Sequence, residues 1–392
     1  MKLVHVIQAS ANVAVWEWKN ILHRPIYWFC MIVLPLSITF FFANIMGEGL
    51  PTEMPIGLVD LDNSATSRKL MRLLDSFQES HIVAHYSDIS QARRAMQQGK
   101  IYAFMYIPAG MERDLLASRQ PKISYYYNNS ILLAGSLLYK DLRVISTLGA
   151  AAVGQARMQA QGYTSQQIKA ALQPIVTDVH ALDNPTLNYN VALSPTIIPA
   201  CICLFIFLMT CYSFGMELKF STSRALMRKA RGSILIAING KMFPQTLVFT
   251  LIMWAYQYWL FIHMGFPYNC SFFFIMLMGW LLVLASQGLG LFIFCILPSM
   301  RMSMSISALW GVLSFSISGF TYPVTAMDPS LQLLSWMFPL RHYFMVYQMS
   351  VFHGFPLYYA WPHVVALSVF VLLPVVGLRR IRNVLYNFEY IP

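Results

Sequence analysis

Apolar residues gather into six long stretches that contain no Asp, Glu, Lys or Arg. The stretches are Ile26 to Met46, Thr196 to Met216, Met242 to His263, Phe272 to Leu297, Met304 to Pro323 and Tyr359 to Leu378. A helix that crosses a membrane needs about 20 mostly apolar residues, and prolines are tolerated inside such helices. The pattern therefore predicts an α-helical polytopic membrane protein with six transmembrane helices.

A polar segment, residues 47–195, separates the first and second apolar stretches and alternates between strand and helix patterns. The expected strands are Ile56 to Leu61, Ile82 to Tyr86, Ile101 to Ile107 and Ile123 to Tyr127. The expected helices run from Asp62 or Ser64 to Gln78, Asp88 to Gly99, Met111 to Ser118, Ile131 to Gln161, and Ser165 to Val179. This alternation predicts an inserted extracytoplasmic α/β domain.

The charges give the orientation. Only 11% of the residues are charged, against about 25% in an ordinary soluble domain. With the N-terminus in the cytoplasm, the inside segments hold three acids, Glu17, Glu217 and Glu389. They also hold the basic residues Lys2, Lys19, Arg24, Lys219, Arg224, Arg228, Lys229, Arg231, Lys241, Arg301, Arg379, Arg380 and Arg382. Cytoplasmic loops favour Lys and Arg. Both termini are thus expected inside, and the net charge of +11 needs no nucleic-acid partner.

These boundaries divide the chain into four parts. Residues 1–25 are expected to form a cytoplasmic amphipathic helix, either along the membrane surface or packed on the bundle. Residues 26–46 form the first span, 47–195 the extracytoplasmic domain, and 196–392 a five-helix membrane region. That last region contains an inside loop, 217–241, and an outer helical hairpin, 324–358.

No catalytic or metal site is expected in this chain. Asp60 and Asp62 are interpreted as structural, and His81 and His85 lie in a predicted strand, where they do not share one face. Both Gly-Lys pairs of the chain lack the following Ser or Thr of a phosphate-binding loop. Because the six stretches also lack carboxylates, ion coupling is disfavoured. Energy for transport is therefore expected from a separate subunit, whose contact is the inside loop. Binding of anionic lipid headgroups by this loop is the alternative.

Several segments together resemble the ABC-2-type permease family, in its exporter branch with a large periplasmic domain. They are Gly57 to Arg68, Gln98 to Pro108, Glu112 to Leu115, Ser318 to Pro323, Met327 and Phe338 to Leu340. The resemblance covers nearly the whole chain. The family's inside loop carries Glu-x-Glu-Arg-Gly-Thr, and this chain has Glu217-Leu-Lys-Phe-Ser-Thr222, which matches only at its two ends.

The resemblance implies a coupling helix that docks on an ATP-hydrolysing subunit, which binds ATP and Mg²⁺. This chain itself is expected to hold no cofactor. The coupling candidates are Glu217, Thr222, Arg224, Met227 and Arg228. It also implies a dimer with a second permease subunit, identical or not, and work beside a periplasmic adaptor and an outer-membrane channel.

The outer hairpin supplies the candidates for an outer gate: Tyr322, Pro323, Pro339, Arg341 and His342. A proline-punctuated apolar segment of this kind lines an outward gate or caps the interface with aromatic residues.

The sequence therefore predicts the membrane subunit of an exporter for a small amphipathic molecule, in a bacterial cytoplasmic membrane. The alternatives are a membrane-anchored sensor or docking protein whose outer domain binds a ligand or envelope partner, and an intramembrane enzyme. The lack of acids at bilayer depth disfavours the enzyme.

Overall fold

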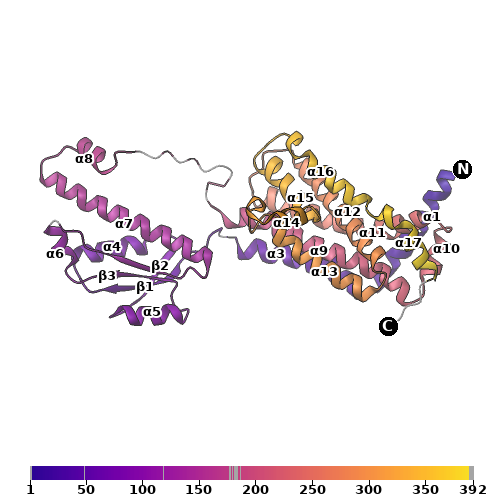
Figure 1. Ribbon diagram of the computed structural model, residues 1–392, viewed down its shortest axis with the longest axis horizontal. Coiled ribbons are helices and arrows are strands. Elements are labelled where there is room, and N and C mark those ends of the chain that lie inside the picture. Colours follow the sequence, from indigo (N-terminus) through magenta and orange to yellow (C-terminus); the bar gives the residue numbers. More distant parts are fainter. Residues whose placement is uncertain are drawn as a thin grey trace. The chain divides into compact units, whose positions relative to one another are not determined.

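The computed structural model describes residues 2–47, 49–117, 119–175, 178, 180, 184, 185 and 187–387 (Figure 1). The expected helix ends at Ser118 and Val179, and the acid Glu389, lie outside the described residues. The chain forms two compact units. We call Met1–Gly47 with Leu182–Pro392 the membrane unit, and Glu48–Ala181 the sheet unit.

All four predicted strands are present in the sheet unit. They are β1 (Met54–Asp60), β2 (Ser80–His85), β3 (Ala103–Ile107) and β4 (Ser124–Tyr127), in the order β2-β1-β3-β4. β1 pairs in parallel with β2 and β3, whereas β4 runs antiparallel at the edge. The helices are α4 (Ala65–Asp75), α5 (Ile89–Gln97), α6 (Met111–Leu116), α7 (Leu132–Ala160) and α8 (Ser165–Leu172).

The two faces of the sheet carry different helices. α4 and α7 cover one face and α5 covers the other (Figure 1). Ser64, one of the two residues expected to begin α4, caps it by accepting a 3.0 Å hydrogen bond from the Ser67 amide. Asp60 accepts the amide hydrogens of Asp62 and Asn63, and Asp62 accepts that of Glu112. The two aspartates thus fasten the end of β1 to the loops that follow it.

Asp141 of α7 is a buried acid whose Oδ2 atom has no hydrogen-bond partner among the described residues. Burial, reinforced by repulsion from Glu79, raises the pKa of Asp141 to about 6. The folded state therefore holds this proton where the unfolded chain, with a pKa of about 3.9, has released it. The stabilisation of the folded state by this retained proton is complete below the pKa of the unfolded chain. It is lost as the pH rises through the pKa of the folded state, about 6.

We therefore expect Asp141→Asn to stabilise the sheet unit at pH 7.5 by about 1–2 kcal/mol, and to change little at pH 4.5. Hydrogen exchange of the β1 and β3 amides, compared between the variant and the wild type at each pH, measures this effect. Asp178→Asn, at an exposed side chain, is the control. An equal gain at both pH values, or none at pH 7.5, contradicts the prediction.

The membrane unit is mostly helical. Its N-terminal part contains α1 (Lys2–His23), α2 (Pro25–Trp28) and α3 (Leu34–Ile45). The remainder contains α9 (Tyr189–Lys219), α10 (Ser223–Lys229), α11 (Ile234–Tyr258), α12 (Phe272–Ile296), α13 (Met300–Ile317), α14 (Pro329–Ser335), α15 (Pro339–Val346), α16 (Leu357–Leu372) and α17 (Pro374–Asn387).

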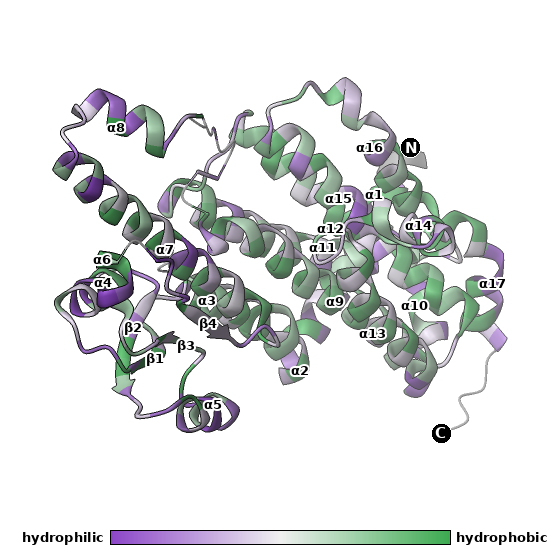
Figure 2. Cartoon of the chain, turned by 60° about the vertical axis from the view of Figure 1, so that its left-hand side comes forward, coloured by the Kyte–Doolittle hydropathy of each residue, from purple (hydrophilic) through white to green (hydrophobic). Residues whose placement is uncertain are grey.

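Within the described residues, five continuous helical segments are long and apolar enough to cross a membrane (Figure 2). They are Pro25–Ile45, Tyr189–Lys219, Ile234–His263, Phe272–Ile296 and Leu357–Asn387. The remaining expected span corresponds to α13, which packs along α9 but has Arg301 in its first turn and contains several serines. Six spans therefore stay a prediction.

Two helices extend beyond the apolar stretches that predicted them. α9 continues through Glu217 to Lys219, and α11 begins seven residues before Lys241. The charged residues Glu217, Lys219 and Lys241 therefore lie in helices that continue past the apolar stretches.

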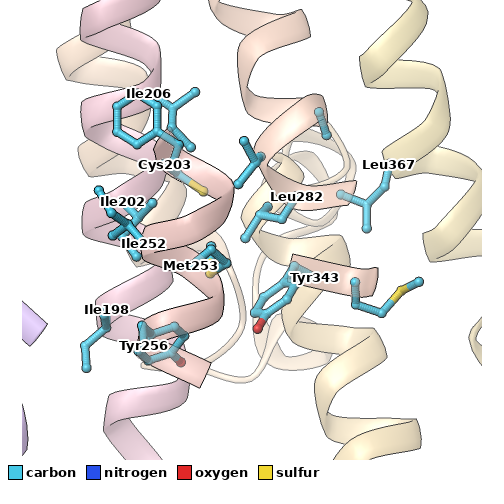
Figure 3. Close-up of a cluster of buried hydrophobic side chains, with 14 of the residues drawn as sticks. Ile198, Ile202, Cys203, Ile206, Ile252, Met253, Tyr256, Leu282, Tyr343 and Leu367 are labelled. Carbon is cyan, nitrogen blue, oxygen red and sulfur yellow. The ribbon is translucent and has the colours of Figure 1, made fainter. Parts of the chain in front are cut away.

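The core of the membrane unit lies between α9, α11, α12, α15 and α16. Figure 3 shows its side chains: Ile198, Ile202, Cys203 and Ile206 of α9, Ile252, Met253 and Tyr256 of α11, Leu282 of α12, Tyr343 of α15 and Leu367 of α16. The Sγ atom of Cys203 accepts a hydrogen bond from the Ser286 hydroxyl at 3.2 Å. Cys203 therefore serves as a small packing residue.

Candidate functional site

The N-terminal helix α1 packs on the membrane unit through one face. Ala9, Val13, Glu17 and Ile21 are buried at intervals of four residues, as expected of one helix face. The contact is close at Gly240 of α11, because a Cβ atom there would lie 2.7 Å from the Val13 side chain. Of the two alternatives, the structure shows a helix packed on the bundle.

This close approach brings three charged side chains together. The Lys241 Nζ atom lies 2.6 Å from Glu17 Oε2 and 2.7 Å from Glu217 Oε1. The exposed fractions are 0% for Glu17, 3% for Glu217 and 1% for Lys241. We call Glu17, Lys241 and Glu217 the ion triad. It joins α1, α9 and α11 at the end of the unit where α10 and α17 also lie (Figure 1).

Polar neighbours satisfy the remaining oxygens of the ion triad. Glu17 accepts hydrogen bonds from the Ser213 hydroxyl at 2.8 Å and from the side-chain amides of Asn20 and Gln245. Glu217 accepts one from the Thr222 hydroxyl at 2.5 Å. The ammonium of Lys241 also lies 5.5 Å from the Trp16 ring centre. Buried charges persist where they are paired and hydrogen-bonded in this way.

The coupling candidates fall into two groups. Glu217 and Met227 are buried inside the membrane unit, whereas Arg224 and Arg228 of α10 are exposed. Thr222 is half-buried and bonds Glu217, so the residue before α10 is linked directly to the ion triad. Of the five candidates, only the two arginines have exposed side chains.

The anchoring of α10 extends to the C-terminal helix. Leu226, Met227 and Ala230 are buried in a cluster that includes Ile381 and Leu385 of α17. The Arg224 Nε atom donates a hydrogen bond to the Tyr386 carbonyl at 3.3 Å. α10 is therefore in contact with α17 and is also linked to the ion triad.

The outer-gate candidates also divide by burial. Tyr322 and Pro323 are exposed, whereas Pro339, Arg341 and His342 are buried around α15. Among these, only Arg341 carries a permanent charge, and its Nε atom has no hydrogen-bond partner among the described residues.

His342 forms a hydrogen-bonded pair with His363 of α16. Their Nδ1 atoms lie 3.0 Å apart, and His342 Nε2 lies 2.9 Å from the Trp336 carbonyl oxygen. A carbonyl only accepts, so His342 carries its proton on Nε2, and His363 donates from Nδ1. The Trp336 ring stacks on His363 at 5.6 Å. The pair fastens α15 and the end of α14 to the start of α16.

Sequence reasoning missed both Lys241 and His363 as site residues. His363 is buried, with 7% of its surface exposed. A signal for the ion triad is present in the sequence, because the inside segments contain so few acids among many basic residues. No group of three or more His, Cys, Asp and Glu side chains in the described part of the chain is arranged to hold a metal ion.

The comparisons with known proteins agree with this architecture. No curated protein sequence matches the chain. A family described as ABC-2 family transporter protein matches residues 25–378, which includes the sheet unit and most of the membrane unit. The family's members are multi-pass membrane subunits that work with an ATP-binding subunit. This chain belongs to the ABC-2 family of transporter proteins, as the permease subunit of an ABC transporter.

Proposed function

We propose that the chain is the six-span membrane subunit of an exporter that moves a small amphipathic molecule out of the cytoplasm or inner leaflet. It lies in a bacterial cytoplasmic membrane with both termini in the cytoplasm and the sheet unit outside. It forms a dimer with a second permease subunit, identical or not, and each permease contacts an ATP-binding subunit that holds ATP and Mg²⁺.

The observation that carries this proposal is the link between α10 and the ion triad. α10 presents Arg224 and Arg228 outward, and its opposite face is buried through Leu226 and Met227. Thr222, just before α10, donates a hydrogen bond to Glu217. The ammonium of Lys241 in turn contacts both Glu217 and Glu17. A surface helix that is both basic outside and rigidly connected inside suits the transfer of force from a partner to the spans.

In this mechanism, ATP binding draws the two partner subunits together beneath the exposed arginines. The displacement passes from α10 through the ion triad to the ends of α1, α9 and α11. Because packed helices move as rigid bodies rather than deforming continuously, the movement reaches the opposite ends of the spans. There the segment from Tyr322 to His342 opens as the outer gate. A periplasmic adaptor and an outer-membrane channel then receive the molecule from the sheet-unit side.

The test is recovery of the ATP-binding subunit with the tagged chain in mild detergent. We expect Arg224→Glu with Arg228→Glu to lower the recovered amount about 10-fold or more, because two contacts become repulsive across the interface. The matched control is Arg379→Glu with Arg382→Glu, which reverses two exposed charges on α17.

The control variant is expected to retain the ATP-binding subunit, and both variants should melt at the wild-type temperature. Equal loss in both variants contradicts the docking role of α10. Folded wild-type protein without any ATP-binding subunit, under several gentle conditions, favours a membrane-anchored sensor or docking protein instead.

A further inference from the structure

Arg341 of α15 is a buried cation without a partner. It is 9% exposed, and it takes part in no ion pair or hydrogen bond with the residues that the structure describes. The only acid of the outer hairpin, Asp328, accepts its hydrogen bonds from Ser330. A buried charge is costly unless an opposite charge and hydrogen bonds compensate for its lost solvation. Within the described part of the chain, nothing supplies that compensation for Arg341.

The position of Arg341 on its helix adds to this cost. Arg341 lies in the first turn of α15, and the preceding residue Phe338 offers no side-chain cap to that helix. The N-terminal end of a helix carries a partial positive charge, which favours anions and disfavours cations. The adjacent pair of His342 and His363 supplies no negative charge either, because a histidine is neutral or cationic. This region of the membrane unit therefore attracts an anion from outside the chain.

The end of the guanidinium can be reached. Of its three nitrogens, only Nε is fully enclosed by the protein. Nη1 lies beside Gly319, where a Cβ atom would come within 3.3 Å of it. Gly319 has a φ of +97°, a left-handed conformation that favours glycine, so no side chain covers Nη1 from this position. The Nη1 and Nη2 atoms present parallel N–H groups, which match two oxygens of a carboxylate, sulfonate or phosphate.

The outer hairpin also exposes large apolar side chains. Leu333 of α14 is 76% exposed, and Trp336 and Met337, which follow that helix, are 48% and 51% exposed. Such side chains offer a surface on which an alkyl chain is removed from water. An occupant with an anionic group and an apolar chain therefore fits this part of the membrane unit.

We propose that Arg341 binds the anionic oxygen group of a single-chain amphiphile through its Nη1 and Nη2 atoms. The exported molecule is then an anionic amphiphile, a statement that rests on the proposed function. The headgroup of an anionic membrane lipid offers the same chemistry, so the experiment includes an arm that distinguishes the two sources. Binding is measured on the chain without an ATP-binding subunit. Failure of the exporter proposal therefore leaves the binding result intact, and the two failures can be told apart.

The test uses the full chain in nanodiscs of zwitterionic lipid and two radiolabelled probes of equal chain length. One probe is a long-chain alkanesulfonate, and the other is the corresponding alkyl methyl sulfone, which keeps the shape of the head group without its charge. The bound amount is corrected for the probe that empty discs retain. We expect the wild type to bind the sulfonate about 10-fold or more tightly than the sulfone, because charge-assisted hydrogen bonds form only with the sulfonate.

Three variants locate the binding group. Arg341→Gln should bind the two probes equally, whereas Arg341→Lys should keep part of the preference, because an ammonium retains the charge without the planar fork. The matched control Arg301→Gln removes an exposed arginine at the opposite end of α13 from Gly319 and should keep the full preference. Without a probe, Arg341→Gln should melt at or above the wild-type temperature, because it removes an unpaired buried charge.

Several outcomes overturn the proposal. Equal binding of the two probes to the wild type, which requires no variant, shows that no anion is selected. Equal loss of the preference in Arg341→Gln and Arg301→Gln shows a general attraction to the basic chain. A lower melting temperature of Arg341→Gln without a probe shows that the guanidinium serves the fold itself.

The last arm repeats the wild-type measurement in discs that contain phosphatidylglycerol. A preference that persists there supports a free amphiphile as the occupant of the site. A preference that disappears assigns the site to an anionic lipid headgroup and overturns the statement about the exported molecule.

Discussion

Replacement of Lys241 by Met is expected to destabilise the membrane unit by about 3–5 kcal/mol. The substitution leaves Glu17 and Glu217 buried side by side, without the ammonium that both contact within 2.7 Å. Two uncompensated carboxylates in a dry interior repel each other and also lose their solvation. The free energy of unfolding in mixed detergent micelles, followed by tryptophan fluorescence, measures the loss.

Two further variants of the chain test whether the loss comes from the ion triad. Lys219→Met removes an exposed lysine at the end of α9, two residues after Glu217, and should change the free energy of unfolding by no more than about 0.5 kcal/mol. The triple variant Glu17→Gln, Lys241→Met, Glu217→Gln should recover part of the loss, because no charge then stays buried. A triple variant less stable than Lys241→Met alone, or equal effects at Lys219 and Lys241, would argue against this account of the ion triad.

Gly288→Ala is expected to force α12 away from α16 and to destabilise the membrane unit. A Cβ atom at position 288 would overlap the carbonyl oxygen of Phe370 and lie 3.1 Å from Val371 Cα. Both are backbone atoms of α16, so a change of rotamer does not relieve the overlap. We expect a loss of about 1–3 kcal/mol, although Ala favours a helix over Gly by about 0.5–1 kcal/mol. Thermal melting of the purified chain measures it.

Gly290→Ala, two residues along the same helix, is the matched control. Its Cβ atom would lie 3.3 Å from the nearest atoms, which belong to Phe207 and Thr210. Because this approach is less close, the expected change is small and of either sign. The packing argument fails if Gly290→Ala melts at the lower temperature of the two.

The sequence predicted the elements well, because strand and helix patterns depend on local spacing. Each predicted strand of the sheet unit is present within about two residues, and Ser64 and Asp88 cap the helices that they were expected to begin. The order of strands and the antiparallel edge strand β4 did not follow from local pattern, since they depend on which strands meet after folding.

The ion triad was not predicted, because its three members lie far apart in the chain and each seemed to mark a helix end. Hydropathy stops a span at the first charge, so Glu217 and Lys241 were assigned to a loop. Only the docking of α1 on Gly240 shows that they belong to the interior. The His342–His363 pair was not predicted either, because His342 was assigned to the outer gate and only the folded structure brings His363 to it.

The ion triad has a consequence for how the chain is made. Glu17 is synthesised 224 residues before the lysine that neutralises it. During that interval Glu17 lacks its cationic partner, and of its hydrogen-bond donors only Asn20 belongs to the same helix. α1 can complete its packing only after α11, which contains Lys241, has entered the membrane. The first helix to leave the ribosome is therefore among the later ones to dock. A nascent chain that ends before Lys241 therefore has an N-terminal helix whose Glu17 lacks its lysine partner.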